Sequence, residues 1–194
     1  LDAMKLAAAV SSSAEICEVT DEASIAAAMA PLTAPFQTVI VATGALEIAG
    51  VAPEKSLARL DGSALAAQFA LNSIGPMLVL KHALRLMPRD APARFAVLSA
   101  RVGSIGDNRL GGWYAYRASK AALNQFVRTA AIELRRRSPG AVCVALHPGT
   151  VETDLSAPFA RSGLEVRPAA TAAAELLHVI AALAPADSGG FFDH

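Results

Sequence analysis

Short β-branched runs alternate with longer alanine-rich stretches along most of this 194-residue chain. Nearly continuous apolar runs are typical of strands covered on both faces, and repeated strand–helix units predict a parallel sheet. We expect strands at 14–19, 38–41, 95–98 and 142–146, and helices at 1–10, 21–30, 63–87, 114–137 and 169–183. Asp21 and Ser63 are the expected caps of two helices, and Pro168 suits the first turn of the last. The pattern predicts an α/β fold, a doubly wound parallel sheet within one domain over 1–194.

Charge and composition exclude several classes of partner. Lys plus Arg and Asp plus Glu both number 17, so the positive excess typical of nucleic-acid or anionic-membrane binding is lacking. Gly, Pro and charged residues interrupt the apolar stretches before the roughly 20 residues that a spanning helix needs. Two cysteines cannot form a disulfide framework, and the four histidines lack ligand spacing. We expect a soluble cytoplasmic protein with no nucleic-acid, membrane or metal partner.

The helix expected at 114–137 carries Tyr116 and Lys120 four residues apart. This spacing places both side chains on one helix face, one turn apart. A phenol titrates near pH 10, and a neighbouring ammonium stabilises the phenolate and lowers the phenol pKa. Tyr116 is therefore a candidate acid/base for a substrate oxygen, although the same spacing also arises by chance in many helices. Tyr114 has no such lysine and is expected to be a packing residue.

The run Tyr-Ala-Tyr-Arg-Ala-Ser-Lys-Ala-Ala-Leu-Asn at 114–124 resembles the active-site helix of the short-chain dehydrogenase/reductase family. Gly-Ser-Ile at 103–105 and Asp-Asn-Arg-Leu-Gly-Gly-Trp-Tyr at 107–114 are similar to its C-factor-like and sniffer-type carbonyl reductase members. The resemblance implies a Rossmann-type fold, NAD or NADP as cofactor, and hydride transfer between nicotinamide and a small carbonyl compound or secondary alcohol. It implies that Tyr116 is the acid/base, and that Lys120 lowers its pKa and holds the nicotinamide ribose.

The resemblance also implies roles for residues elsewhere in the chain. Asn72 matches the asparagine whose helix kinks to hold a relay water beside the lysine. The matching cofactor-binding positions are Asp21, Ala42, Thr43, Gly44, Lys120, Val151 and Thr153. Asp21 would face the adenine. Ala42, Thr43 and Gly44 stand where the family has Asn-Ala-Gly. Val151 and Thr153 would contact the nicotinamide carboxamide.

The family's catalytic serine should fall at position 100, which is Ala100. Ser99 is adjacent, but successive strand residues point to opposite faces, so Ser99 can substitute only where the strand has ended. Ser104 lies twelve residues before Tyr116, close to the usual spacing in the family, and is our candidate for the missing hydroxyl. Alternatively, both serines serve only as turn and strand-end residues.

No glycine precedes Gly44, so the glycine-rich turn with which this fold binds pyrophosphate is absent. By resemblance, the first β-α-β segment, roughly 30 or more residues, precedes Leu1, and the chain stops at His194 soon after its last strand would begin. A sheet without its central strand would expose two strand edges. We therefore expect the intact protein to be longer than this sequence.

A second hypothesis is a catalytically weak homologue that acts as a nucleotide-binding or signalling protein, which Ala100 and the missing glycine turn favour. Both hypotheses allow self-association, because small and apolar residues surround much of the helices expected at 63–87 and 114–137. We expect a homodimer or higher homo-oligomer. The candidates for its buried seam, or for the side facing the sheet, are Leu78, Leu80, Phe126 and Val127.

Overall fold

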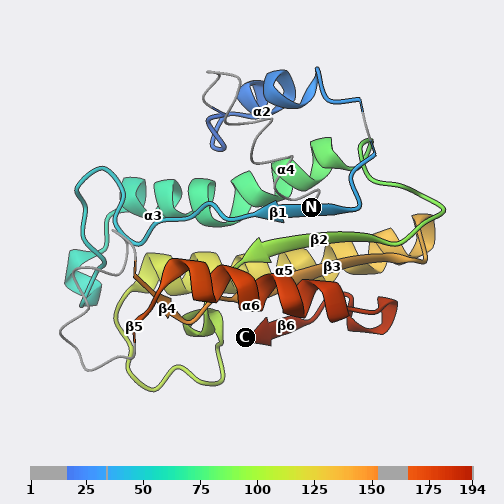
Figure 1. Ribbon diagram of the computed structural model, residues 1–194. Helices are drawn as coiled ribbons and strands as arrows, with labels where there is room; N and C mark the ends of the chain where they lie inside the picture. The colour runs from blue at the N-terminus through green and yellow to red at the C-terminus, as the bar shows by residue number, and fades with distance from the viewer. Residues whose placement is uncertain (1–16, 34, 153–165, 194) are drawn as a thin grey trace.

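The computed structural model describes residues 17–33, 35–152 and 166–193, and a parallel sheet lies at its centre. The sheet contains β1 (Thr38–Val41), β2 (Ala93–Leu98), β3 (Ala141–His147) and β6 (Phe191–Asp193), in that spatial order (Figure 1). Its register places Val39, Phe95 and Cys143 side by side. A separate parallel pair joins β4 (Thr150–Val151) to β5 (Val166–Arg167). Because the strands of the main sheet are parallel, their carboxyl ends meet at one edge.

Helices cover both faces of the sheet (Figure 1). They are α2 (Glu22–Met29), α3 (Gly62–Phe69), α4 (Gly75–Ala83), α5 (Tyr114–Arg137) and α6 (Ala169–Ala182), with 3₁₀ turns at Leu57–Arg59, Arg101–Gly103 and Pro185–Asp187. Phe95 and Val97 of β2 lie in a buried cluster with α4 and α5, whereas Ala96 packs with Leu176 and Ile180 of α6. Successive β2 side chains therefore face opposite helix layers. The predicted doubly wound α/β fold is confirmed.

Most predicted elements agree with the structure to within about two residues. The strand predicted at 38–41 and the helix predicted at 114–137 have the expected bounds, and β2 begins two residues earlier than predicted. Asp21 caps α2, and its carboxylate accepts a hydrogen bond from the Ala23 amide at 3.0 Å. Pro168 immediately precedes α6 instead of lying in its first turn. The helix predicted at 1–10 lies outside the described residues.

The strand predicted at 14–19 is wrong over its described part, residues 17–19. The Glu18 amide donates to Ser24 Oγ at 2.9 Å, and the Glu18 carboxylate accepts from the Thr20 amide at 2.9 Å. These local bonds make a turn that leads into α2. Among the described residues, the strands of the main sheet are contiguous in the order β1-β2-β3-β6, and β1 is an outer strand.

The single helix predicted at 63–87 is divided into three parts. Between α3 and α4 lies a π-helical turn, Ala70–Ile74, and α4 ends at Ala83. Asp61 caps α3 in place of Ser63, because its carboxylate accepts from the Ala64 amide at 2.8 Å. Among the described residues, one helical segment, Gly62–Ala83, has the length and the apolar composition needed to cross a membrane. A single segment of this kind is weak evidence for a membrane span. Its polar residues Gln68 and Asn72 are buried and hydrogen-bonded within the domain, so we assign it to the core.

Candidate active site

Two strand ends, the π-turn and α5 meet around Lys120, which is 3% exposed. Lys120 Nζ donates to the carbonyl of Leu98, the last residue of β2, at 2.9 Å. Asn72, fully buried in the π-turn, binds the loop after β1 through both ends of its amide: Oδ1 accepts from the Ala45 amide at 3.0 Å, and Nδ2 donates to the Ala45 carbonyl at 2.8 Å. Asn72 and Lys120, both predicted from the sequence, approach the same residue of this loop, Gly44.

Gly44 is the point at which these elements come closest. A Cβ atom at this position would lie 2.9 Å from Asn72 Oδ1 and 3.2 Å from Lys120 Nζ, and Gly44 has a φ of +155°. Any side chain here would displace the asparagine and crowd the ammonium. The glycine therefore allows Asn72 Oδ1 and Lys120 Nζ to approach the same bare stretch of backbone.

Tyr116 lies one turn before Lys120 on α5, in a small apolar cluster with Leu46 and Ala100. Trp113 meets its ring edge-on with 6.4 Å between ring centroids, and Lys120 Nζ lies 5.8 Å from the Tyr116 ring centroid. Burial raises the pKa of Tyr116 to about 12 and lowers the pKa of Lys120 to about 8. The expected lowering of the Tyr116 pKa is not found, because desolvation of the phenol is the larger effect. At neutral pH Tyr116 keeps its proton.

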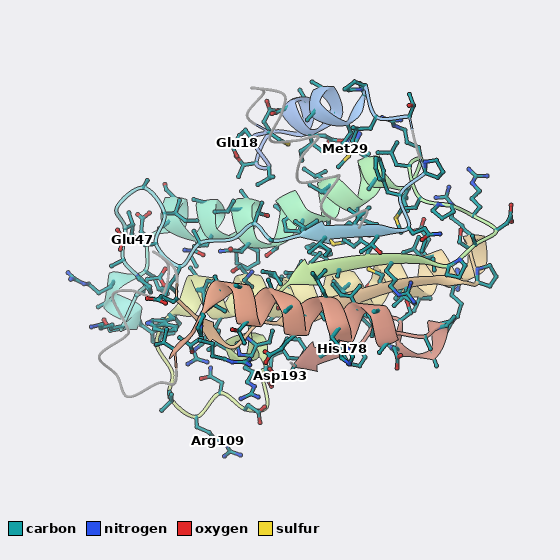
Figure 2. All side chains as sticks on the ribbon, in the orientation of Figure 1. Glu18, Met29, Glu47, Arg109, His178 and Asp193 are labelled. Atoms are coloured by element: carbon teal, nitrogen blue, oxygen red, sulfur yellow. The ribbon has the colours of Figure 1, made fainter. Side chains whose placement is uncertain are left out.

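The structure places the alternatives for the missing serine in different surroundings. Ala100, at the position where the hydroxyl was expected, lies in the cluster with Tyr116. Ser99 Oγ donates to Asn124 Oδ1 at 2.7 Å, and Asn124 lies two turns after Tyr116 on α5. Ser104 lies on the loop before α5, on which Figure 2 labels Arg109. Its Oγ accepts a hydrogen bond from the Asp107 amide at 3.3 Å, as the hydroxyl of a turn residue does. A catalytic role for Ser104 stays a prediction.

The remaining predicted cofactor positions are spread over the described chain. Thr43 Oγ1 is buried and has no hydrogen-bond partner among the described residues, whereas its neighbour Ala42 is exposed. Val151 lies in β4 and pairs with Arg167 of β5. Asp21 is engaged as the cap of α2, so its contact with an adenine stays a prediction. Thr153 lies outside the described residues.

Two residues that the sequence analysis did not identify support the site. Gln68 Nε2 donates to the Leu46 carbonyl at 2.8 Å, and Gln68 Oε1 accepts from Asn72 Nδ2 at 2.5 Å. Glu54 binds the start of α5: its carbonyl accepts from the Trp113 amide at 2.5 Å, and its carboxylate accepts from the Ala115 amide at 3.2 Å. The four-residue spacing from Gln68 to Asn72 could have indicated the first contact. No local signal links Glu54 to a helix that begins 60 residues later.

A cavity of about 270 Å³ adjoins Tyr116. Its walls come from the loop that follows β1, from α3 and its cap, and from the tyrosine itself. The side chains on the loop side are mainly apolar, and Glu54 lies among them. The site therefore combines a protonated phenol, a buried ammonium and an adjacent space of molecular size.

Comparisons with known proteins agree on one family. The family model described as enoyl-(acyl carrier protein) reductase matches residues 2–183. C-signal of Myxococcus xanthus is 40% identical over 139 residues, which cover 72% of this chain and 80% of C-signal. The 1-hydroxy-2-glutathionyl-2-methyl-3-butene dehydrogenase of Rhodococcus sp. (strain AD45) is 32% identical over 174 residues, which cover 90% of this chain and 74% of that enzyme.

Solved structures give the same result. The NADPH-bound carbonyl reductase from chicken fatty liver superposes with a TM-score of 0.78 at 29% identity, covering 92% of this chain and 73% of the reductase. The carbonyl reductase Sniffer of D. melanogaster has a TM-score of 0.74 at 24% identity, covering 91% of this chain and 73% of Sniffer, and supports the fold alone.

Proposed function

Because this chain belongs to the short-chain dehydrogenase/reductase family and is an NAD(P)-dependent oxidoreductase, we propose that it interconverts a small carbonyl compound and the corresponding alcohol, with Tyr116 exchanging a proton with the substrate oxygen. The observation that carries the proposal is the buried pair Tyr116 and Lys120, one turn apart on α5 beside the end of β2. Short-chain reductases are among the structural neighbours with bound NADPH or NADP.

The residues around Gly44 fit the nicotinamide end of that cofactor. The bare backbone of Gly44 leaves space that a Cβ would close, and Thr43 Oγ1 is a buried polar atom with no partner among the described residues. When bound, NAD(P) supplies or accepts the hydride at the substrate carbon. By family resemblance, Lys120 Nζ would hold the nicotinamide ribose and the Val151 backbone would hold the carboxamide.

Tyr116 would act as a proton donor when a carbonyl compound is reduced. With its pKa raised to about 12 by burial, the phenol is protonated at neutral pH and can donate its O–H proton to the oxygen that becomes the alcohol. The phenolate left behind lies near the Lys120 ammonium, which stabilises the negative charge. Asn72 would act from the π-turn by fixing the loop after β1 against the lysine, and the relay water implied by the resemblance stays a prediction.

We do not favour the signalling alternative, because the acid/base candidate and its lysine are both present and buried side by side. Ala100 removes one hydroxyl from the site but leaves the proton donor in place. A cytoplasmic location and a homo-oligomeric state stay predictions.

The test is Tyr116→Phe, which removes the hydroxyl and keeps the ring. With NADPH or NADH and an accepted ketone, kcat should fall by about 10² to 10⁴-fold, while cofactor affinity barely changes. The matched control is Tyr114→Phe, since Tyr114 is the neighbouring tyrosine on α5 and lacks a lysine one turn later. The assignment is refuted if the two variants have the same kcat as the unmodified enzyme.

A further inference from the structure

The cavity beside Tyr116 has a defined size and a mainly apolar lining. At about 270 Å³ it is large enough for a small organic molecule. Leu46, Ile48 and Val51 line it from the loop after β1, and Ala64 and Ala67 line it from α3. Such walls favour alkyl or ring carbons over polar groups.

The charged residues that line this cavity are acidic. They are Glu54, which is 7% exposed, and Asp61, and the lining contains no Lys, Arg or His from the described residues. The Glu54 carboxylate is held by the Ala115 amide at the start of α5, and the Asp61 carboxylate by the Ala64 amide at the start of α3. These bonds keep both carboxylates at the wall, where each helix N-terminus offsets only part of the negative charge.

We propose that this cavity is the substrate pocket, that it takes a small apolar ketone or aldehyde, and that Glu54 excludes substrates that carry a negative charge. The proposal rests on the proposed function, because it places the substrate carbonyl beside Tyr116. A second anion in an apolar cavity that already contains a buried carboxylate finds no cation among the described residues that line it, so its binding is disfavoured by desolvation and by repulsion. The same walls accept an uncharged ring of similar shape.

Binding can be measured without turnover, because Trp113 is the single tryptophan of the sequence and touches the Tyr116 ring. The probes are 4-methylcyclohexanone and 4-oxocyclohexanecarboxylate, which have similar shapes and differ in charge. Trp113 fluorescence should report a Kd at least about tenfold lower for the uncharged ketone. Equal Kd values for the two probes would overturn the proposal.

Glu54→Gln tests the charge, since a glutamine Oε1 can still accept from the Ala115 amide. The preference for the uncharged probe should shrink by about tenfold. The matched control is Glu47→Gln, because Glu47 is an exposed acid on the same loop that does not line the cavity (Figure 2). If Glu54→Gln and Glu47→Gln change the preference equally, Glu54 is not the determinant.

Ala67→Leu tests the location by filling the cavity from α3, and it should weaken binding of 4-methylcyclohexanone by about tenfold. Ala66→Leu is its control, because Ala66 is exposed on the same helix and does not line the cavity. Equal affinities in the two variants would place the ketone elsewhere. If the binding results are as expected but neither NADPH nor NADH reduces the bound ketone, the proposed function fails while the pocket assignment stands.

Discussion

Gly44→Ala tests whether the approach of Asn72 and Lys120 to the β1 loop is as close as the structure indicates. The added Cβ would lie 2.9 Å from Asn72 Oδ1, so the asparagine must move and its hydrogen bond with the Ala45 amide breaks. Losing a buried hydrogen bond and adopting an unfavourable φ together cost about 3 kcal/mol, after a small gain from the restricted unfolded chain. For a chain of this length, Tm should fall by about 6 to 12 °C.

Differential scanning calorimetry measures the fall, and Gly50→Ala is the matched control. Gly50 has a φ of +76°, and a Cβ there meets no atom within 4 Å, so that variant bears the backbone penalty alone, about 1 to 2 kcal/mol. Adding Asn72→Ala should remove part of the Gly44→Ala cost, because the displaced amide is no longer present. Equal Tm losses for the two glycine variants, or full additivity with Asn72→Ala, would refute the reasoning.

Three further predictions concern pH, the missing hydroxyl and assembly. Burial lowers the pKa of Lys120 from 10.5 to about 8, so the unfolded chain binds this proton more readily, and stability should fall by about 2 kcal/mol as pH drops from about 10 to 8. The free energy of unfolding of Lys120→Met, measured with urea, should lack this pH dependence. Cys143, whose pKa burial raises to about 12, contributes equally to both proteins, so the difference between them isolates the effect of Lys120. Parallel pH profiles for the two proteins would contradict the burial argument. Ala100→Ser adds a hydroxyl beside Tyr116 and should raise kcat about tenfold, which is the effect of one good hydrogen bond. If Ala100→Ser leaves kcat unchanged and Ser104→Ala lowers it, Ser104 is the hydroxyl donor instead. Phe126 is 42% exposed on α5, and a dimer interface would cover its ring. Sedimentation velocity at micromolar concentration should therefore show a dimer, which Phe126→Lys should dissociate. A single monomeric species that does not change on tenfold concentration would rule the interface out.

The strongest predictions from the sequence came from features that act locally. The helix at 114–137 has the predicted bounds because glycines precede it and its apolar positions recur with helical period. The first strand failed for the opposite reason: residues 17–19 have the composition of a strand, but hydrogen bonds to Ser24 and from Thr20 make a turn instead. Ser63 and Asp61 are both good caps, and only the observed bond to Ala64 decides between them.

The site was predictable where one helix carries it and less so elsewhere. Tyr116 and Lys120 follow from their spacing, but the direction of the Tyr116 pKa shift depends on burial by Leu46 and Ala100, which come from distant parts of the chain. The contacts of Glu54 likewise exist only in the folded protein. Of the four residues predicted for a seam or a sheet-facing side, Leu80 and Val127 are buried in the core, which assigns those two to the sheet-facing side.

The π-turn between α3 and α4 keeps a row of inward-facing side chains straight. In a regular helix, positions four residues apart drift by about 40° per step, so a row of four such positions would turn by about 120° around the axis. The extra residue in the π-turn takes back about 100° of this rotation. Gln68, Asn72, Pro76 and Leu80, all buried, can therefore share one line from the cavity wall to the sheet core. Deleting any one residue between 70 and 74 would turn α4 by more than a quarter revolution and remove either the amide or the leucine from its place.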